Sequence, residues 1–277
     1  MSHNIKIHPC FGDDCETYAR LHLPVAPACN IQCNYCLRKY DCVNESRPGV
    51  TTRLLSSEEA VLLCERAAKK MKNLTVVGIA GPGDALANFD EVYTTLQKIR
   101  EKNIPVEFCV STNGLNLFKS LPQLLELEVK YLTITVNAVD VEIGSKIYEY
   151  VIWQDQMLVG EAAFRRLSAN QLQGIRAAVD KGIICKINTI VIPGINDQHI
   201  PEIAETVGGL GCYMQNLIPM INVSGTKFER LPVYQKADLL ALRKKCSLYI
   251  KQMEHCQRCR ADACGTLMHS YEYFIQE

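Results

Sequence analysis

Three cysteines fall within eight residues of this chain, in the segment Cys29-Asn-Ile-Gln-Cys33-Asn-Tyr35-Cys36. Three thiolates at this spacing hold a four-iron cluster and leave one iron open to a further ligand. Structural zinc sites need a fourth ligand, for which Cys42 is available, but they normally come as paired Cys-x-x-Cys elements. The spacing therefore favours an iron-sulfur cluster with one open coordination position.

The remaining cysteines are unevenly distributed. Residues 1–8 contain no basic segment followed by an apolar core, so we expect no secretory signal and a reducing, cytoplasmic location. In such a compartment, clustered cysteines indicate metal binding or catalysis rather than disulfides. A second group near the end of the chain comprises Cys256, Cys259 and Cys264, and Cys10 and Cys15 lie near its start. Five further cysteines are isolated: Cys64, Cys109, Cys185, Cys212 and Cys246.

The overall charge excludes some classes of partner. The 277 residues include 30 Lys and Arg against 30 Asp and Glu, so the formal net charge is zero. No global field then draws the protein to nucleic acid or to an anionic membrane. The uncharged stretch 206–226 is too rich in glycine and amides to span a membrane. We therefore expect a soluble protein that binds neither nucleic acid nor membrane.

The elements that must position these cysteines alternate between strand and helix. Ser56 and Glu59 form a capping-box pattern that opens a helix ending near Met71. Strands are predicted at 20–26, 74–80, 106–111, 130–137, 183–192 and 212–220, and helices at 88–102, 118–128, in a long region ending at 181, at 198–207 and at 235–252. Near-continuous apolar strands between helices predict an α/β barrel or partial barrel with a parallel sheet. Residues 20–252 form this barrel, flanked by tails 1–19 and 253–277 that we expect to act as ligand-bearing lids.

Polar residues gather where the predicted strands end, which is where such folds place their chemistry. Gly81-Pro82-Gly83-Asp84 follows the second strand, while hydroxyl and amide side chains lie at the ends of later strands: Ser111, Asn113, Asn137 and Asn188. Each of these alone is compatible with an ordinary turn or cap. Together with the cysteine segment they indicate a binding site.

Cys29, Cys33, Tyr35 and Cys36 resemble the motif of the radical S-adenosylmethionine (SAM) superfamily, whose fold is a partial (β/α)6 TIM-like barrel. The resemblance implies that the open iron chelates the amino and carboxylate groups of SAM. The Gly81–Asp84 loop stands where the superfamily usually has Gly-Gly-Glu, with glycines that permit close approach and an acid that meets the ammonium group. It thus implies a SAM site formed by Tyr35, Gly81, Gly83, Asp84, Ser111, Asn113, Asn137, Asn188 and Ile190.

Six sequence blocks narrow the resemblance to the NifB family of nitrogenase cofactor maturation enzymes. They lie at 8–11 (HPCF), 21–26, 29–42, 44–50 (NESRPGV), 78–84 and 259–263. Many members carry an extra C-terminal carrier domain, so this chain resembles the short stand-alone, archaeal-type form. The resemblance implies a carbide synthase, which cleaves SAM reductively to a 5'-deoxyadenosyl radical and also takes its methyl carbon. Two 4Fe-4S clusters would be fused with that carbon and one sulfide into the 8Fe-9S-C precursor of the cofactor, NifB-co.

The same resemblance implies ligands for the two substrate clusters. One would be held by Cys10, Cys109 and a histidine, for which we expect His8 because it lies two residues from Cys10 on one side of an extended segment. His3 and His22 are the alternatives. The other cluster would be held by Cys42, Cys256 and Cys259, with Cys264 either a spare ligand or a packing residue. Glu65, on the first helix, is a candidate proton acceptor or oxygen ligand.

These assignments imply SAM, iron-sulfur cluster donors, an electron donor such as ferredoxin or flavodoxin, and nitrogenase cofactor scaffold or carrier proteins as partners. Two other functions are compatible with clustered cysteines. One is a non-catalytic iron-sulfur carrier, against which the Gly-Pro-Gly-Asp loop and the strand-end asparagines argue. The other is a different radical SAM enzyme with auxiliary clusters, against which the blocks at 8–11 and 44–50 argue.

Overall fold

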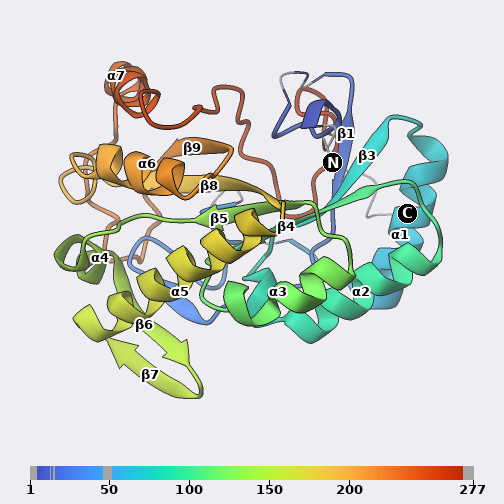
Figure 1. Ribbon diagram of the computed structural model, residues 1–277, viewed down its shortest axis with the longest axis horizontal. Coiled ribbons are helices and arrows are strands. Elements are labelled where there is room, and N and C mark those ends of the chain that lie inside the picture. The colour runs from blue at the N-terminus through green and yellow to red at the C-terminus, as the bar shows by residue number, and fades with distance from the viewer. Residues whose placement is uncertain (1–4, 13, 15, 46–51, 271–277) are drawn as a thin grey trace.

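The computed structural model describes residues 5–12, 14, 16–45 and 52–270 (Figure 1). His3, Cys15 and most of the block at 44–50 lie outside the described residues. Within the described part, no helix is long and apolar enough to cross a membrane.

The fold is a curved, seven-stranded sheet with helices along its outer side (Figure 1). Six strands run parallel in the order β1, β3, β4, β5, β8 and β9, with bounds Ala19–His22, Leu74–Ile79, Glu107–Thr112, Tyr131–Thr135, Ile184–Val191 and Met214–Pro219. The short strand β10 (Cys264–Gly265) pairs antiparallel with β1. This arrangement confirms the predicted partial barrel.

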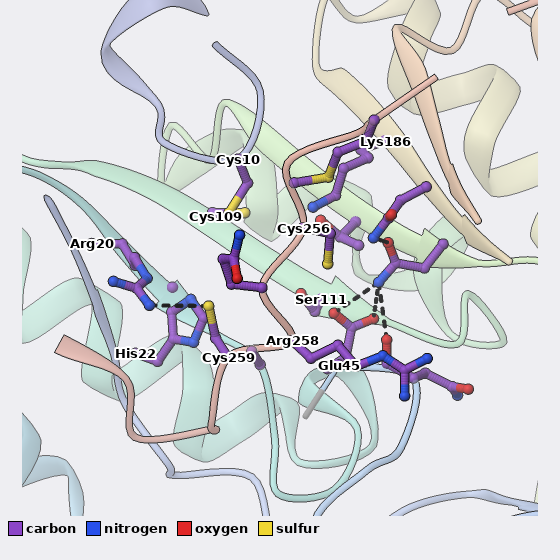
Figure 2. A pocket seen from close by; sticks show the side chains of 18 of the residues that line it. Cys10, Arg20, His22, Glu45, Cys109, Ser111, Lys186, Cys256, Arg258 and Cys259 are labelled. Atoms are coloured by element: carbon purple, nitrogen blue, oxygen red, sulfur yellow. Dashed lines mark hydrogen bonds between the residues drawn. The ribbon is translucent and has the colours of Figure 1, made fainter. Parts of the chain in front are cut away.

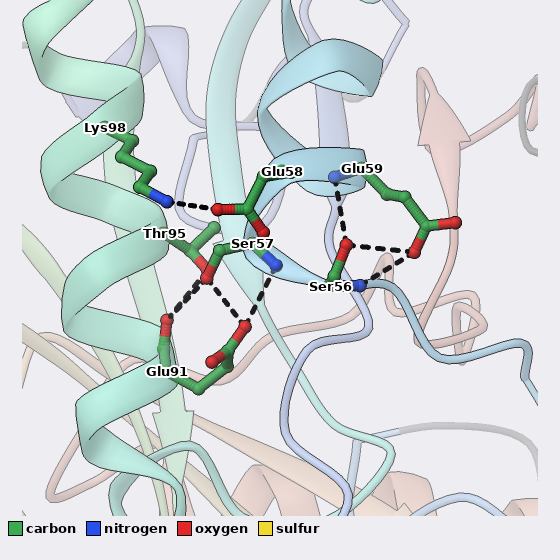
Figure 3. Close-up of polar contacts among 7 residues, drawn as sticks. All are labelled: Ser56, Ser57, Glu58, Glu59, Glu91, Thr95 and Lys98. Carbon is green, nitrogen blue, oxygen red and sulfur yellow. Dashed lines mark hydrogen bonds and ion pairs between the residues drawn. The ribbon is translucent and has the colours of Figure 1, made fainter.

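The helices are α1 (Ser57–Lys70), α2 (Phe89–Glu101), α3 (Leu117–Glu126), α4 (Val141–Ile147), α5 (Gly160–Asp180), α6 (Ile200–Gly209) and α7 (Lys236–Cys246), with short 3-10 turns η1 (Ile5–Ile7) and η2 (Ala85–Ala87). The predicted capping box opens α1 (Figure 3). The Ser56 hydroxyl accepts the Glu59 N–H, and the Glu59 carboxylate accepts the Ser56 N–H at 2.9 Å. Ser57 also donates its N–H to the Glu91 carboxylate at 2.9 Å, which joins α1 to α2.

The two faces of the sheet differ in chemistry. The outward side chains of its strands, such as Val77, Val110 and Ile187, are fully buried in the main core against the helices. Alternate residues of the same strands point inward, because side chains alternate along a strand. These inward positions carry polar and ionisable groups, among them Arg20, His22, Cys109, Ser111, Lys186 and Asn188. The inner face of the sheet is therefore built for binding rather than for packing.

The prediction of one helical region ending at residue 181 was wrong. Between α4 and α5 the chain forms a hairpin of β6 (Tyr148–Trp153) and β7 (Gln156–Val159). Gln154 and Asp155 both have positive φ, the backbone of a two-residue hairpin turn. Alternating aromatic and β-branched residues in β6 favour a strand. Strand β6 of this hairpin pairs antiparallel with β2 (Ile31–Cys33) and so supports the cysteine segment through its backbone.

The C-terminal tail crosses from one edge of the sheet to the other. Helix α7 ends at Cys246, earlier than predicted, and Gln252 then pairs with Gln215 of β9. The tail then runs to β10, where Gly265 pairs with Arg20 of β1. In Figure 1 it is the orange-to-red segment that returns from α7 toward β1. Residues 256–259 consequently lie over the inner face of the sheet.

Candidate functional site

Three predicted ligands, Cys29, Cys33 and Cys36, line one cavity of about 400 Å³, which we call the cysteine-loop cavity. Burial raises the pKa of Cys29 to about 12 and holds that of Cys33 well above its ordinary value. Metal cations stabilise thiolates, so a bound cluster would reverse this effect of burial. Three thiols grouped on one cavity wall fit metal ligation, in which each thiolate supplies one ligand.

Glycine at position 83 allows two loops to approach each other closely. A Cβ there would lie 2.1 Å from the Ala28 carbonyl oxygen, in a loop whose carbonyls accept hydrogen bonds from the Gly83 and Asp84 N–H groups. The Asp84 carboxylate accepts from the N–H groups of Leu86, Ala87 and Asn113 and from the Thr112 hydroxyl. Asp84 thus joins the loops after β3 and β4 and lines the cysteine-loop cavity.

Tyr35 is buried behind the cysteine-loop cavity wall in a hydrogen-bond network, and its own side chain does not line that cavity. Its hydroxyl donates to Asn44 Oδ1 at 2.8 Å and accepts from Asn137 Nδ2 at 2.6 Å. Asn137 Oδ1 in turn accepts the Ile190 N–H at 2.8 Å. Tyr35, Asn137 and Ile190 therefore brace the cysteine segment against the ends of β5 and β8, and the structure gives them a supporting position rather than one on a cavity wall.

A second cavity of about 700 Å³, the inner cavity, lies between the sheet and the tails (Figure 2). It brings together Cys10 from the N-terminal tail, Cys109 from β4, and Cys256 and Cys259 from the C-terminal tail. Cys42, expected beside the last two, lines the cysteine-loop cavity instead. The two cavities adjoin, because Asn44, Glu45 and Ser111 line both.

Two histidines line the inner cavity in different tautomers. His8 Nδ1 accepts the Cys10 N–H at 3.1 Å, so the proton of the neutral ring is on Nε2, which is buried without a partner. His22 Nδ1 lies 3.1 Å from the carbonyl oxygen of Arg260, which can only accept, so its Nε2 carries the lone pair. Burial lowers the pKa of both rings, to about 4 for His22. His22 therefore presents a nitrogen suited to bind iron, and the hydrogen bond from its other ring nitrogen to the Arg260 carbonyl fixes the orientation of the ring.

Ionisable groups that the sequence did not single out complete the inner cavity. Burial raises the pKa of Glu45 to about 7, although Lys186 and hydrogen bonds from Ser111 and Asn188 oppose the rise. Burial acts to lower the pKa of Lys186, but Cys10 and other anionic neighbours raise it overall. Lys186 Nζ lies 5.1 Å from the centre of the Phe11 ring. The sequence did contain a signal for Lys186. It lies two residues before Asn188 on the same strand, so the two side chains share a face of the sheet.

Two further predicted site residues, Glu65 and Cys264, lie away from both cavities, and neither cavity is lined by Tyr35, Gly81, Asn137 or Ile190. Glu65, on α1, forms an ion pair with Lys102 at 3.2 Å. Cys264 is fully buried in the main core, with Sγ 3.9 Å from Met71 Sδ. Cys264 of β10 pairs with Leu21 of β1, and both side chains pack in the main core on the helical side of the sheet. Arg20, the neighbour of Leu21 on β1, faces the cavity. Cys264 is thus a packing residue, as are the buried Cys64, Cys185, Cys212 and Cys246.

The family model described as the radical SAM superfamily matches residues 23–207, and the chain belongs to this superfamily. Within it, the chain is homologous to the FeMo cofactor biosynthesis protein NifB. It is 45% identical over 268 residues to NifB of Chlorobaculum tepidum, covering 96% of this chain and 63% of that protein. It is 45% identical to NifB of Bradyrhizobium diazoefficiens, covering 95% and 54%, and 43% identical to NifB of Klebsiella pneumoniae, covering 94% and 57%. The chain therefore spans less than two thirds of these relatives.

Solved structures agree with the fold. Streptococcus suis SuiB bound to S-adenosylmethionine superposes with a TM-score of 0.60 at 17% identity, covering 87% of this chain and 52% of SuiB. The protein anSMEcpe with bound AdoMet and Cp18Cys peptide gives a TM-score of 0.59 at 14% identity, covering 84% and 62%. At these identities the likeness establishes the architecture alone.

Proposed function

We propose that this chain is a radical SAM enzyme of nitrogenase cofactor biosynthesis. It joins two 4Fe-4S clusters, with a SAM-derived carbide and a sulfide, into the 8Fe-9S-C precursor. The observation that carries this proposal is a pair of adjoining cavities, one lined by the three thiols of the superfamily motif and the other by four further thiols. The homology to NifB supports the same function.

In this proposal Cys29, Cys33 and Cys36 hold the resident cluster, which when bound supplies the electron that cleaves SAM. The walls of the cysteine-loop cavity place polar groups beside these thiols, including Gly83, Asp84, Ser111 and Asn113. Asn113 Nδ2 lies 3.9 Å from Cys29 Sγ and 2.7 Å from Asn30 Oδ1, so its amide is held against the cysteine segment. These residues bind and orient SAM, while Gly81 shapes the loop with its positive φ.

The substrate clusters occupy the inner cavity, one at Cys10 and Cys109 and one at Cys256 and Cys259. We propose His22 in place of His8 as the nitrogen ligand of the first, because of its tautomer. Cys42 reaches the second cluster only from the neighbouring cavity. The buried cations Lys186 and Arg20 offset the negative charge that two clusters bring into a site of low dielectric.

Glu45 takes the role of proton acceptor that the sequence suggested for Glu65. Turning a methyl carbon into a carbide removes three hydrogens, so the site needs a base as well as a radical. Among the described residues, Glu45 and Asp84 are the acids that line these cavities. Both acids accept hydrogen bonds, Asp84 from four donors and Glu45 from three side chains. Glu45, however, borders both cavities, and burial raises its pKa to about 7, which suits a general base.

A labelling experiment tests the function. The protein is reconstituted with iron and sulfide without oxygen, reduced with dithionite and given SAM with a 13C-labelled methyl group. We expect 5'-deoxyadenosine and an iron species with strong 13C hyperfine coupling, both absent from a variant with Cys29, Cys33 and Cys36 changed to Ala. SAM cleavage without 13C in the iron species would favour a different radical SAM enzyme with auxiliary clusters, and no cleavage at all would favour an iron-sulfur carrier.

The partners in this proposal follow from the same chemistry. Cluster donors supply the substrate, a ferredoxin or flavodoxin supplies electrons, and a scaffold or carrier protein accepts the product. Both tails contribute thiols to the inner cavity, so residues 1–19 and 253–277 are proposed as ligand-bearing lids on the barrel 20–252.

A further inference from the structure

Arg20 lies on β1 directly beneath the C-terminal tail, and its side chain is 1% exposed. Its Nη2 donates to Cys259 Sγ at 3.0 Å (Figure 2). Its Nη1 donates to the carbonyl oxygens of Gly265 and Thr266. One guanidinium group thus contacts both a proposed cluster ligand and the backbone that follows it.

In the part of the chain that the structure describes, no carboxylate pairs with Arg20. Its Nε is buried without a hydrogen-bond partner. A guanidinium stays protonated even when buried, and a buried charge without a counter-ion is strongly destabilising. A nearby anion would therefore stabilise Arg20. Besides two carbonyl oxygens, its guanidinium group contacts the sulfur of Cys259.

We propose that Arg20 is a positioning residue that donates a hydrogen bond to Cys259 Sγ while this sulfur ligates a substrate cluster, and that it raises the reduction potential of that cluster. The inference rests on the proposed function, which places a cluster at Cys256 and Cys259. Hydrogen bonds to cluster sulfurs and nearby positive charge stabilise the reduced form, which carries one more electron. The step is a one-electron reduction by an added reductant, with no bond made or broken.

A purely structural role would be to fasten the tail, but the tail has other anchors nearby. His22 Nδ1 donates to the Arg260 carbonyl at 3.1 Å, and the His22 N–H donates to the Ala263 carbonyl at 2.8 Å. Strand β10 adds its own pairing with β1. Removal of the Arg20 side chain should therefore leave the tail attached while it removes the contact with sulfur, so that the two roles can be separated.

The first test uses the full chain labelled with arginine that carries 15N only in its guanidinium group, because the backbone nitrogens of Arg258 and Arg260 flank Cys259. Cysteines 10, 29, 33, 36 and 109 are changed to Ala so that only the proposed cluster at Cys256 and Cys259 remains. After reconstitution and reduction with dithionite, pulsed EPR should show a weak 15N coupling. The coupling should vanish in Arg20→Lys and persist in Arg258→Lys, a control that lines the same cavity and donates to the Pro219 carbonyl. Absence of 15N coupling from a bound, reduced cluster would overturn the role of Arg20.

The second test is a redox titration of the same cluster. In Arg20→Gln we expect a tenfold lower ratio of reduced to oxidised cluster at a fixed potential, which is about 59 mV for a one-electron couple. Arg20→Lys keeps the charge without the planar fork and should show a smaller change. In the chain with all its cysteines, the cluster at Cys29, Cys33 and Cys36 should keep its potential.

An unchanged potential with iron retained would show that Arg20 only fastens the tail, and the proposal would fail. If Arg20→Gln bound no cluster, the reduction potential of Arg20→Lys and the 15N coupling would still distinguish the proposed role of Arg20 from that of a tail anchor. Failure of the proposed function is distinguishable, because then the changes Cys256→Ser and Cys259→Ser would leave the iron content of the parent protein unchanged.

Discussion

The amide nitrogen Nδ2 of Asn188 lies 3.2 Å from both carboxylate oxygens of Glu45. Asn188 comes from β8, whereas Glu45 comes from the segment that follows the cysteine loop. The contact places a carboxylate on the wall between the two cavities and holds it there. Asn188, expected from the sequence to contact SAM, lines the inner cavity and positions an acid that the sequence did not single out.

Glu45→Gln should lower formation of the 13C-labelled iron product by at least about a hundredfold, since general bases contribute factors of this order. SAM cleavage should continue. In the parent protein, product formation should rise with pH through about 7 as the Glu45 carboxyl ionises. The variant should lack this step. A variant with parent-like product yield at every pH would contradict the assignment. Glu107→Gln is the control, because Glu107 is a half-buried acid of β4 that pairs with Lys130 and lines neither of these cavities.

The same substitution should change the pH dependence of stability. The pKa of Glu45 is raised from 4.5 to about 7 on folding, so its contribution is present below pH 4.5 and is lost as pH rises through 7. Glu45→Gln should therefore be more stable than the parent above pH 7, by at most about 3 kcal/mol. Urea unfolding of the metal-free proteins at pH 5 and pH 8 measures this, and equal differences at both pH values would refute it.

His22→Ala should abolish a strongly coupled histidine nitrogen in pulsed EPR of the reduced protein. The reason is that His22 Nε2 carries the lone pair, whereas His8 Nδ1 is engaged by the Cys10 N–H. His8→Ala should keep the nitrogen coupling, although it removes a buried ring that packs on Phe11 and Tyr131. If only His8→Ala lost the coupling, the ligand would be His8, as the sequence predicts.

Cys10→Ser should lower the iron content by about one 4Fe-4S cluster, because Cys10 lines the inner cavity. Cys264→Ala should leave the iron content unchanged, since its sulfur lies in the core beside Met71. It should cost about 1 kcal/mol of stability through lost packing. Iron assays on both reconstituted variants make the comparison, and a fall in iron for Cys264→Ala would place that cysteine among the ligands.

Gly83→Ala should destabilise the protein by about 3 kcal/mol and reduce loading of the cluster at the cysteine loop. The added Cβ would lie 2.1 Å from a backbone oxygen that cannot move without shifting the loop before Cys29. Gly209→Ala, at the end of α6 with nothing within 4 Å of the added carbon, is the control. It should be neutral or up to about 1 kcal/mol more stable. Thermal unfolding and iron content report both effects, and equal behaviour of the two variants would count against the close approach.

Local sequence was sufficient for much of the fold. The capping box at Ser56 and Glu59 and the apolar run of β3 depend on neighbours within a few residues, and both were predicted correctly. The hairpin of β6 and β7 was missed although β6 carries local strand signals, because its turn Gln154-Asp155 lacks the glycine typical of such turns and its other partner, β2, lies more than 100 residues earlier in the chain. Strand β10 was missed for the same reason, since two residues become a strand only when β1 offers an edge.

For the site, the sequence by itself was enough to propose the three ligands Cys29, Cys33 and Cys36, because their spacing and the blocks around them are local features. Only the tertiary structure decided which groups meet. It brought Arg20 and Lys186 to the inner face of the sheet and Glu45 to the wall between the cavities, and it turned Cys264 into the core. The physical reason is that alternation along a strand offers two faces, and which of them becomes a cavity depends on the sheet's curvature and on the tail that crosses it.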